Sequence, residues 1–420
     1  MITRDVLQRL YDAASIQRWN DHARPFEMVE LGKQAHKMVI AYVIARFEED
    51  RVFQTGGAPA AGGGGGSREG DPVDWQGIIE GGIFEFLHRI ILTDIKPSVF
   101  HRMMEEKGRE LNTFVLGRIQ GDLREIAGGL GERFERYLMD PGFCFLEKRI
   151  LQAAHYLATN WEFRFIYQLN PFIYGIQKTK AEIENRLEDF YDLIGVQKIS
   201  LGRKSFGFID LCGQLRFQKR WSGTVRVPQT SVLGHMLIVA VFSYLCTLEI
   251  GACPRRRYND FFAGLFHDLP EVLTRDIISP VKRSIQGLEE IISDYEKLQY
   301  REVLLPLLPG AWHREMLYFN QDEFLNKIVE DGRVVTDVPE RDMRERYNHD
   351  QYSPVDGTVI RACDETAAFM EAVLSVEHGI KSPHLVSFIK DFTERYRGRR
   401  VGGIDFGGIM EEFLADGERG

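Results

Sequence analysis

Four side chains in the second half of the sequence could together bind one divalent metal ion: His235, His267, Asp268 and Asp364. His267 and Asp268 are adjacent and follow an apolar segment. Neighbouring side chains at a helix end diverge by ~100°, so both can reach one ion. Imidazole nitrogen together with carboxylate oxygen suits Mn, Fe, Co, Zn or Mg. Such an ion lowers the pKa of a bound water and offsets charge as a P–O bond breaks.

Each of these residues also has a simpler interpretation. A single His at the start of an apolar helix, such as His235, is usually a core or capping residue. Asp337 competes with Asp364 for the fourth ligand position, but it lies beside a Pro in VVTDVPE, whereas Asp364 has small neighbours on a helical pattern. A second His-Asp dipeptide, at 349–350, lies in a polar stretch with Pro and Gly and is expected to be a solvated loop.

The segments around the four side chains resemble the HD phosphohydrolase superfamily. The block FHDLPEVLTRDIISPVK (266–282) is similar to the HD-x-x-E-x-x-x-x-D-x-x-x-P-V-K block of bacterial 5′-deoxynucleotidases and their archaeal relatives. ACDETAAFMEA (362–372) is similar to the family's last ligand helix, and an Arg-Trp pair (220–221) precedes His235 as in that branch. The sequence departs from the branch in having Gly234 where Glu usually precedes the first His, and in a long extension at about 305–358.

The resemblance implies a role for each matching residue. Glu271, one helical turn beyond Asp268, would orient the water or transfer a proton. Arg220 would hold the phosphate through paired donors. Trp221 and Asp276 would lie beside the sugar, and Lys282 is a weaker candidate for a phosphate contact. The residues implied as metal ligands are His235, His267, Asp268 and Asp364, with the identity of the divalent metal (Mn, Co, Mg, Fe or Zn) left open.

The elements that must position these side chains are predicted to be helices. Runs such as 36–47 and 235–248 are long and apolar, and 104–138, 176–194 and 284–304 carry apolar residues at three- and four-residue spacing. Period-two alternation is scarce, and the run 222–232 contains a Pro that favours a loop. We therefore predict an all-α fold.

A diverged duplication changes the expected domain organisation. GIFEFLHRIILTDIKPSV (82–99) aligns without gaps with GLFHDLPEVLTRDIISPV (264–281), and similar segments flank both in the same order. In the first copy Glu85 and Phe86 replace the His-Asp pair, His155 stands where Asp364 would be, and His36 is matched with His235. The first copy is thus expected to be catalytically inactive, as a structural or regulatory pseudo-domain.

The duplication predicts tandem helical bundles of the HD type. The expected boundaries are 1–175 for the degenerate repeat, 176–204 for a connecting helix or linker, and 205–420 for the catalytic domain. The Gly-rich run at 56–67 would be a flexible loop inside the first repeat. The two repeats would pair as a pseudo-dimer within one chain, and a homodimer of chains is the alternative.

Composition limits the classes of partner and compartment. The net charge of −9 argues against binding of extended nucleic acid. Five Cys without a CxxC pair argue against a disulfide framework or thiolate zinc site. The start of the sequence lacks the apolar core of a signal peptide, and no apolar run reaches membrane-spanning length, so we expect a cytoplasmic protein.

The sequence predicts a phosphohydrolase that cleaves a nucleoside or deoxynucleoside 5′-monophosphate through a metal-activated water. An HD phosphodiesterase or pyrophosphohydrolase acting on another nucleotide is the first alternative. A nucleotide-sensing pseudoenzyme is the second.

Overall fold

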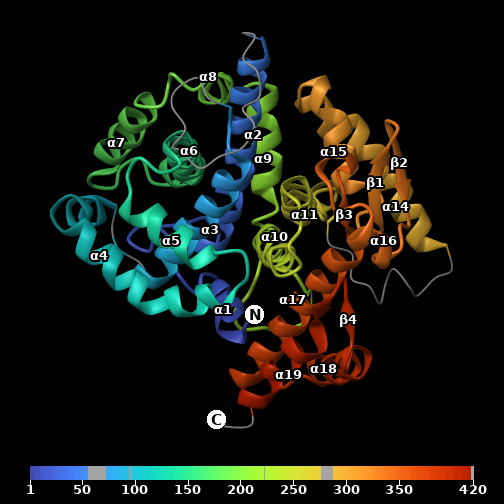
Figure 1. Ribbon diagram of the computed structural model, residues 1–420. Helices are drawn as coiled ribbons and strands as arrows, with labels where there is room; N and C mark the ends of the chain where they lie inside the picture. Colours follow the sequence, from blue (N-terminus) through green and yellow to red (C-terminus); the bar gives the residue numbers. More distant parts are fainter. Residues whose placement is uncertain (55–71, 94, 96, 222, 276–286, 418–420) are drawn as a thin grey trace. The chain divides into compact units, whose positions relative to one another are not determined.

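A computed structural model gives the structure of the protein, and it describes all residues except 55–71, 94, 96, 222, 276–286 and 418–420. The chain divides into two compact units. Unit 1 comprises Met1–Asp12, Asp122–Gly131 and Gln218–Gly420, and unit 2 comprises Ala13–Gly121 and Glu132–Phe217. Helices dominate both units, which confirms the all-α prediction (Figure 1).

Three helices form the centre of unit 1: α10 (Val232–Glu249), α11 (Pro254–Phe266) and α17 (Gly357–Glu377). α10 is apolar around its whole circumference, and it packs against both α11 and α17. A Cβ on Gly264 would lie 3.0 Å from the Cα of Ala240, which is tighter than most real Cβ contacts, so α10 and α11 approach closely at this glycine. This close approach brings the end of α11 beside the start of α10.

α10 is the one helix among the described residues that is long and apolar enough to cross a membrane. Within the structure 94% of it is buried. The packing of unit 1 therefore explains its apolar character, because the central helix of a folded core can be as long and as apolar as a membrane-spanning helix.

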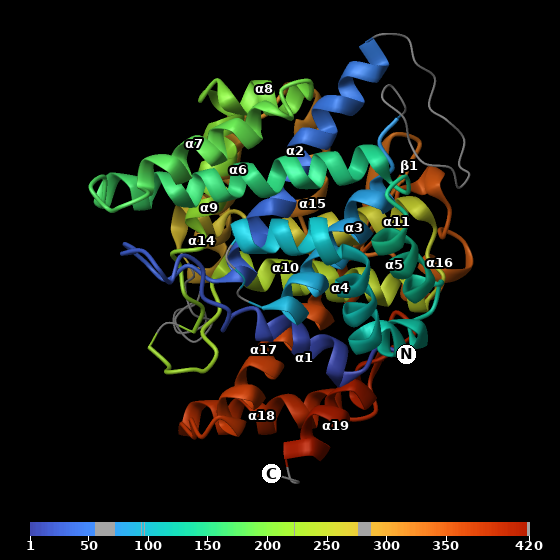
Figure 2. The same ribbon diagram turned by 90° about the vertical axis from the view of Figure 1, so that its left-hand side faces the viewer.

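The remaining helices of unit 1 surround this centre. The N-terminal helix α1 (Arg4–Asp12) lies beside the C-terminal helices, as the blue and red ends of the chain show in Figures 1 and 2. Tyr11 donates a hydrogen bond to the carbonyl of Ala367 on α17 (2.8 Å), and Arg4 forms an ion pair with Glu377 (2.9 Å). The others are α12 (Glu271–Thr274), α14 (Leu288–Gln299), α15 (His313–Asn320), α16 (Glu340–Glu345), α18 (Pro383–Tyr396) and α19 (Phe406–Gly417), with short turns η1 (Tyr300–Leu304), η2 (Leu305–Leu307), η3 (Gly310–Trp312) and η4 (Asp350–Tyr352).

A small antiparallel sheet lies within the predicted extension at 305–358. Its strand order is β2 (Arg333–Thr336), β1 (Asn326–Glu330), β3 (Val355–Asp356), and a separate hairpin joins β4 (Arg400–Val401) to β5 (Ile404–Asp405). The side-chain oxygen of Asn326 accepts from the backbone N–H of Thr358, at the start of α17 (3.1 Å). Arg256 of α11 forms a buried ion pair with Asp356 (2.6 Å). The extension is thus attached to the starts of both α11 and α17.

Unit 2 is built around α2 (Glu30–Gln54) and α6 (Phe145–Leu169), which pack against each other and cross in the view of Figure 2. α3 (Trp75–Leu92), α8 (Ile194–Ser200) and α9 (Lys204–Gln214) also contact α2, and α7 (Ile176–Glu188) packs on α6. α4 (Pro97–Glu125) ends, and α5 (Leu130–Met139) begins, within the segment Asp122–Gly131 that is assigned to unit 1.

The domain boundaries differ from those expected from the sequence. Residues 176–204 are part of unit 2 rather than a separate connection, because a Cβ on Gly195 of α8 would lie 2.6 Å from the Cα of Ile44 on α2. Residues 1–12 belong to unit 1, where α1 packs against the C-terminal helices. The whole Gly-rich run at 56–67 lies outside the described residues.

Candidate metal centre

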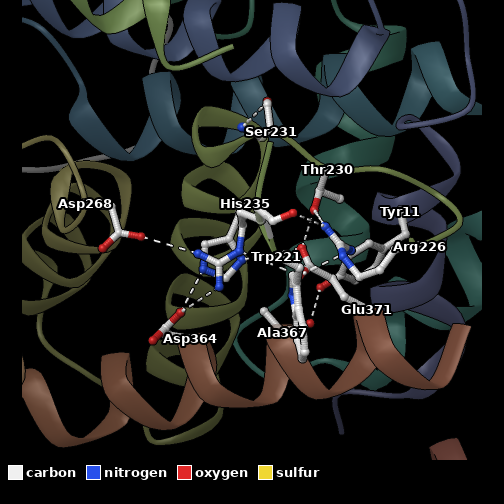
Figure 3. A network of polar contacts seen from close by, with 12 residues as sticks. Tyr11, Trp221, Arg226, Thr230, Ser231, His235, Asp268, Asp364, Ala367 and Glu371 are labelled. Atoms are coloured by element: carbon white, nitrogen blue, oxygen red, sulfur yellow. Dashed lines mark hydrogen bonds and ion pairs between the residues drawn. The ribbon is translucent and has the colours of Figure 1, made fainter. Parts of the chain in front are cut away.

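His235 lies in the first turn of α10, at the centre of unit 1. The Ser231 side chain caps the helix by accepting from the Gly234 N–H (3.1 Å), and this fixes where the first turn begins. The His235 side chain is fully buried, and its Nε2 is 2.7 Å from Oδ1 of Asp364. Asp364 is therefore directed toward the His235 imidazole (Figure 3), and the role of the two residues as metal ligands stays a prediction.

His267 and Asp268 lie at the C-terminal end of α11. The Nδ1–H of His267 donates to the carbonyl of Gly264 in the preceding turn (2.8 Å), which leaves Nε2 as the nitrogen that can bind a metal. This Nε2 is 3.1 Å from Oδ2 of Asp268. Ligand atoms of His235, His267 and Asp268 all lie within 4.8 Å of one another, and no other such group occurs among the described residues.

Burial and charge determine the protonation of the four side chains. Burial lowers the pKa of His235, so its imidazole is neutral, as a metal ligand must be. Burial would also lower the pKa of His267, but the charge of Asp268 outweighs burial and raises it to about 9. Burial would raise the pKa of Asp268 and Asp364, but the neighbouring imidazoles hold both below their ordinary values. Two ionised carboxylates and two imidazoles thus converge, a donor set that fits a divalent cation.

Arg220 reaches this cluster from the loop before α10. Its guanidinium nitrogens lie 3.5 Å from Oδ2 of Asp268 and 3.9 Å from Oδ1 of Asp364, and only 14% of the side chain is exposed. The side chain therefore faces the predicted ligands rather than bulk solvent. A fixed guanidinium beside a metal site is suited to bind an oxyanion that also contacts the metal.

Glu371, two turns beyond Asp364 on α17, holds the loop in place. It accepts from Nε1 of Trp221 (2.8 Å) and from the hydroxyl of Thr230 (2.5 Å), and Arg226 lies 3.5 Å away (Figure 3). Burial would raise the pKa of Glu371, but Arg226 and Arg220 outweigh it and lower the pKa to about 2. Sequence reasoning did not assign a role to Glu371, although the similarity of the 362–372 segment to the family's ligand helix includes this Glu.

The structure says less about the other predicted site residues. Glu271 opens α12 three residues after Asp268, and its backbone carbonyl accepts from Nε2 of Gln218 (3.2 Å). Its catalytic role stays a prediction. Asp276 and Lys282 lie outside the described residues. Asp337, the alternative ligand, follows the exposed strand β2 and is not in the cluster at His235.

The extension also contributes side chains next to the centre. The Phe324 ring lies 6.2 Å from the His267 ring, and the Arg361 guanidinium lies over Phe324 at 5.1 Å. Burial raises the pKa of Glu323, whose carboxyl also interacts with the charges of His267 and Asp268. No sequence pattern pointed to these individual residues, because the segment has no counterpart in the family's motifs.

Comparison with known proteins agrees with this geometry. Residues 212–392 match the family model of the HD domain. The matched segment includes Arg220, Trp221 and all four predicted ligands, and proteins of the HD family are generally metal-dependent hydrolases. Among curated proteins no match to the chain is found.

Proposed function

We propose that the HD domain hydrolyses a phosphate monoester, namely a nucleoside or deoxynucleoside 5′-monophosphate. The observation that carries this proposal is the position of Arg220, whose guanidinium lies within 4 Å of both Asp268 and Asp364. A terminal phosphate has two free oxygens that a guanidinium can bind in pairs while a third oxygen faces the metal.

His235, His267, Asp268 and Asp364 would hold the divalent ion, which when bound supplies an activated water and offsets charge on the phosphate. The protein's own groups complete the site. Arg220 binds the phosphate and orients it, and Glu371 keeps the Arg220–Trp221 loop in position through the Trp221 Nε1–H. Glu271 orients the water or accepts its proton. Trp221 provides an apolar surface for the sugar.

Two other functions remain as alternatives. A phosphodiesterase or pyrophosphohydrolase would use the same metal ligands on a different nucleotide. A nucleotide-sensing protein would bind the same ligand without turnover. The fixed Arg220 favours a terminal phosphate, because a phosphodiester offers one free oxygen fewer for paired hydrogen bonds.

Product analysis of a nucleotide panel separates these functions, with inorganic phosphate, pyrophosphate and nucleoside monophosphate each counted. The panel contains ribo- and deoxyribonucleoside 5′-monophosphates, cyclic nucleotides and nucleoside triphosphates, each with Mn, Co or Mg. We expect inorganic phosphate from the 5′-monophosphates alone. Cleavage of cyclic nucleotides or triphosphates without monophosphates would replace the proposal with the first alternative. Binding of 5′-monophosphates to metal-loaded protein without turnover would replace it with the second.

A further inference from the structure

Two loops, one in each unit, have the same local geometry. Residues 17–30 and 219–232 both run from an isolated antiparallel bridge to the start of a long helix. The bridges join Gln17 with Val29 and Lys219 with Ser231. Trp19 and Trp221, two residues after the first member of each bridge, both have a positive φ, at 55° and 59°. Such a backbone conformation is uncommon for a bulky residue, so its recurrence at the same place is informative.

Both loops are fastened by the same kind of contact. The indole of Trp19 donates to Oε2 of Glu162 at 2.8 Å, as Trp221 donates to Oε2 of Glu371 at 2.8 Å. Arg18 bonds to Glu162 (2.9 Å), whereas Arg220 lies 3.6 Å from Glu371. The Arg-Trp-Glu arrangement around the metal centre therefore has a counterpart in unit 2.

This register identifies the residues that replace the metal ligands. Lys33 is four residues after the bridge residue Val29, as His235 is four residues after the bridge residue Ser231. His155 is seven residues before Glu162, as Asp364 is seven residues before Glu371. The sequence alignment had matched His36 with His235, which is wrong by three residues. His36 instead bonds through Nε2 to the carbonyl of Ile209 (2.8 Å) and packs against Trp161.

We infer that unit 2 is a copy of the HD centre in which the amine of Lys33 occupies the place of the metal ion. Nζ of Lys33 forms a hydrogen bond with Nδ1 of His155, the residue in the place of Asp364. A lysine side chain is longer than a histidine side chain, so its amine lies beyond the position of the imidazole nitrogen. A metal bound to that nitrogen would lie in the same direction.

The amine lies in a buried, charged surrounding. Lys33 is fully buried, and so is the carboxylate of Glu30, which accepts from Arg18 (2.8 Å). Burial lowers the pKa of Lys33, and the charge of Glu30 opposes that shift. Whether or not it carries a proton, the amine fills the space and supplies N–H donors.

The two positions that match the His-Asp pair are also unavailable to a metal. Glu85, in the place of His267, accepts from Tyr137 (2.8 Å) and forms an ion pair with Lys37 (2.5 Å). Phe86, in the place of Asp268, is buried and apolar. Unit 2 thus has its own amine where unit 1 would take up an ion, and it is complete without metal.

The inference rests on the proposed metal centre of unit 1, and a pair of grafted variants tests it separately. Both variants carry Lys37→Val, Glu85→His, Phe86→Asp and His155→Asp, which copy the residues of unit 1. One variant keeps Lys33, and the other adds Lys33→His. Bound Mn or Co is counted per chain after gel filtration, and circular dichroism with a cooperative thermal transition verifies folding.

We expect one more metal equivalent than in the wild type when Lys33→His is present, and no extra equivalent when Lys33 is kept. Extra metal in the variant that keeps Lys33, or no difference between two folded variants, would overturn the inference. A wild-type protein that binds no metal would instead contradict the proposed function, while the comparison of the two grafts would still be valid.

A second measurement applies if the grafts do not fold. His267→Ala combined with Asp268→Ala removes the ligands of unit 1 alone. We expect this variant to bind no metal, because the amine of Lys33 fills the remaining centre. Retention of one tightly bound equivalent would mean that unit 2 binds metal, and the inference would fail.

Discussion

The centres of the two units share the contacts that hold the Arg-Trp loop but differ in the side chains that the loop adjoins. In both, an Arg-Trp loop with a left-handed Trp is tied to a buried Glu on a long helix. In unit 1 two imidazoles and two carboxylates face one another, whereas in unit 2 a lysine amine contacts His155 and a second lysine neutralises Glu85. The contacts that support the loop are therefore separable from the ligands, because the buried charges of each centre are paired in a different way.

Loss of the His-Asp pair should have the largest effect and should separate the two units most clearly. His267→Ala or Asp268→Ala is expected to abolish phosphate release and metal binding, because either change removes a ligand. Glu85→Ala, at the matching place in unit 2, should leave turnover per folded molecule unchanged. Steady-state kinetics and metal analysis of the variants provide the measurement, and equal losses of turnover in both units would contradict the comparison.

Glu271→Gln should have the next largest effect. The substitution keeps the side-chain shape but removes the ability to take a proton, so kcat should fall by ~10²–10⁴. Metal content should stay at the wild-type value, because Glu271 is not a ligand. A parallel loss of metal would reassign Glu271 to the ligand set, and an unchanged kcat would remove it from the mechanism.

Arg220→Ala should weaken substrate binding more moderately. Loss of a charge-assisted contact costs roughly 1.5–3 kcal/mol, so kcat/KM should fall by about ten- to a hundredfold, mainly through KM. The loss should be the same for every sugar and base, because Arg220 contacts phosphate. Arg18→Ala in unit 2 should leave KM unchanged and lower the unfolding temperature instead, because Glu30 and Glu162 lose a buried cation.

The smallest expected effect compares the two tryptophans. Trp221→Phe and Trp19→Phe each remove one indole hydrogen bond to an ionised Glu, which is worth about 1–2 kcal/mol of unfolding free energy. Urea unfolding followed by circular dichroism measures both. Similar losses of unfolding free energy in the two variants would show that the two indole hydrogen bonds stabilise their loops equally. A loss in only one variant would show that the two bonds differ in strength.

Much of unit 1 could be predicted from local patterns. The helical spacing gave the all-α fold, and the types and spacing of His235, His267, Asp268 and Asp364 identified residues that converge in the structure. The Arg-Trp pair was also identified, and Arg220 lies beside the ligands as expected. The types and spacing of these residues could be read before their contacts were known, and their roles as ligands and phosphate contact stay predictions.

The helical class and the candidate ligands follow from local residue patterns, and the same patterns predict a related segment near the N-terminus. Only the tertiary structure decided the boundaries of the units, because the packing of α8 on α2 and of α1 near α19 depends on residues far apart in the chain. It also replaced His36 with Lys33 as the counterpart of His235. Matching the first His of each apolar helix selects His36, but it sets the two Arg-Trp pairs three residues out of register. In the fold, the bridge and the helix start fix the register, and they bring Lys33 within hydrogen-bonding distance of His155.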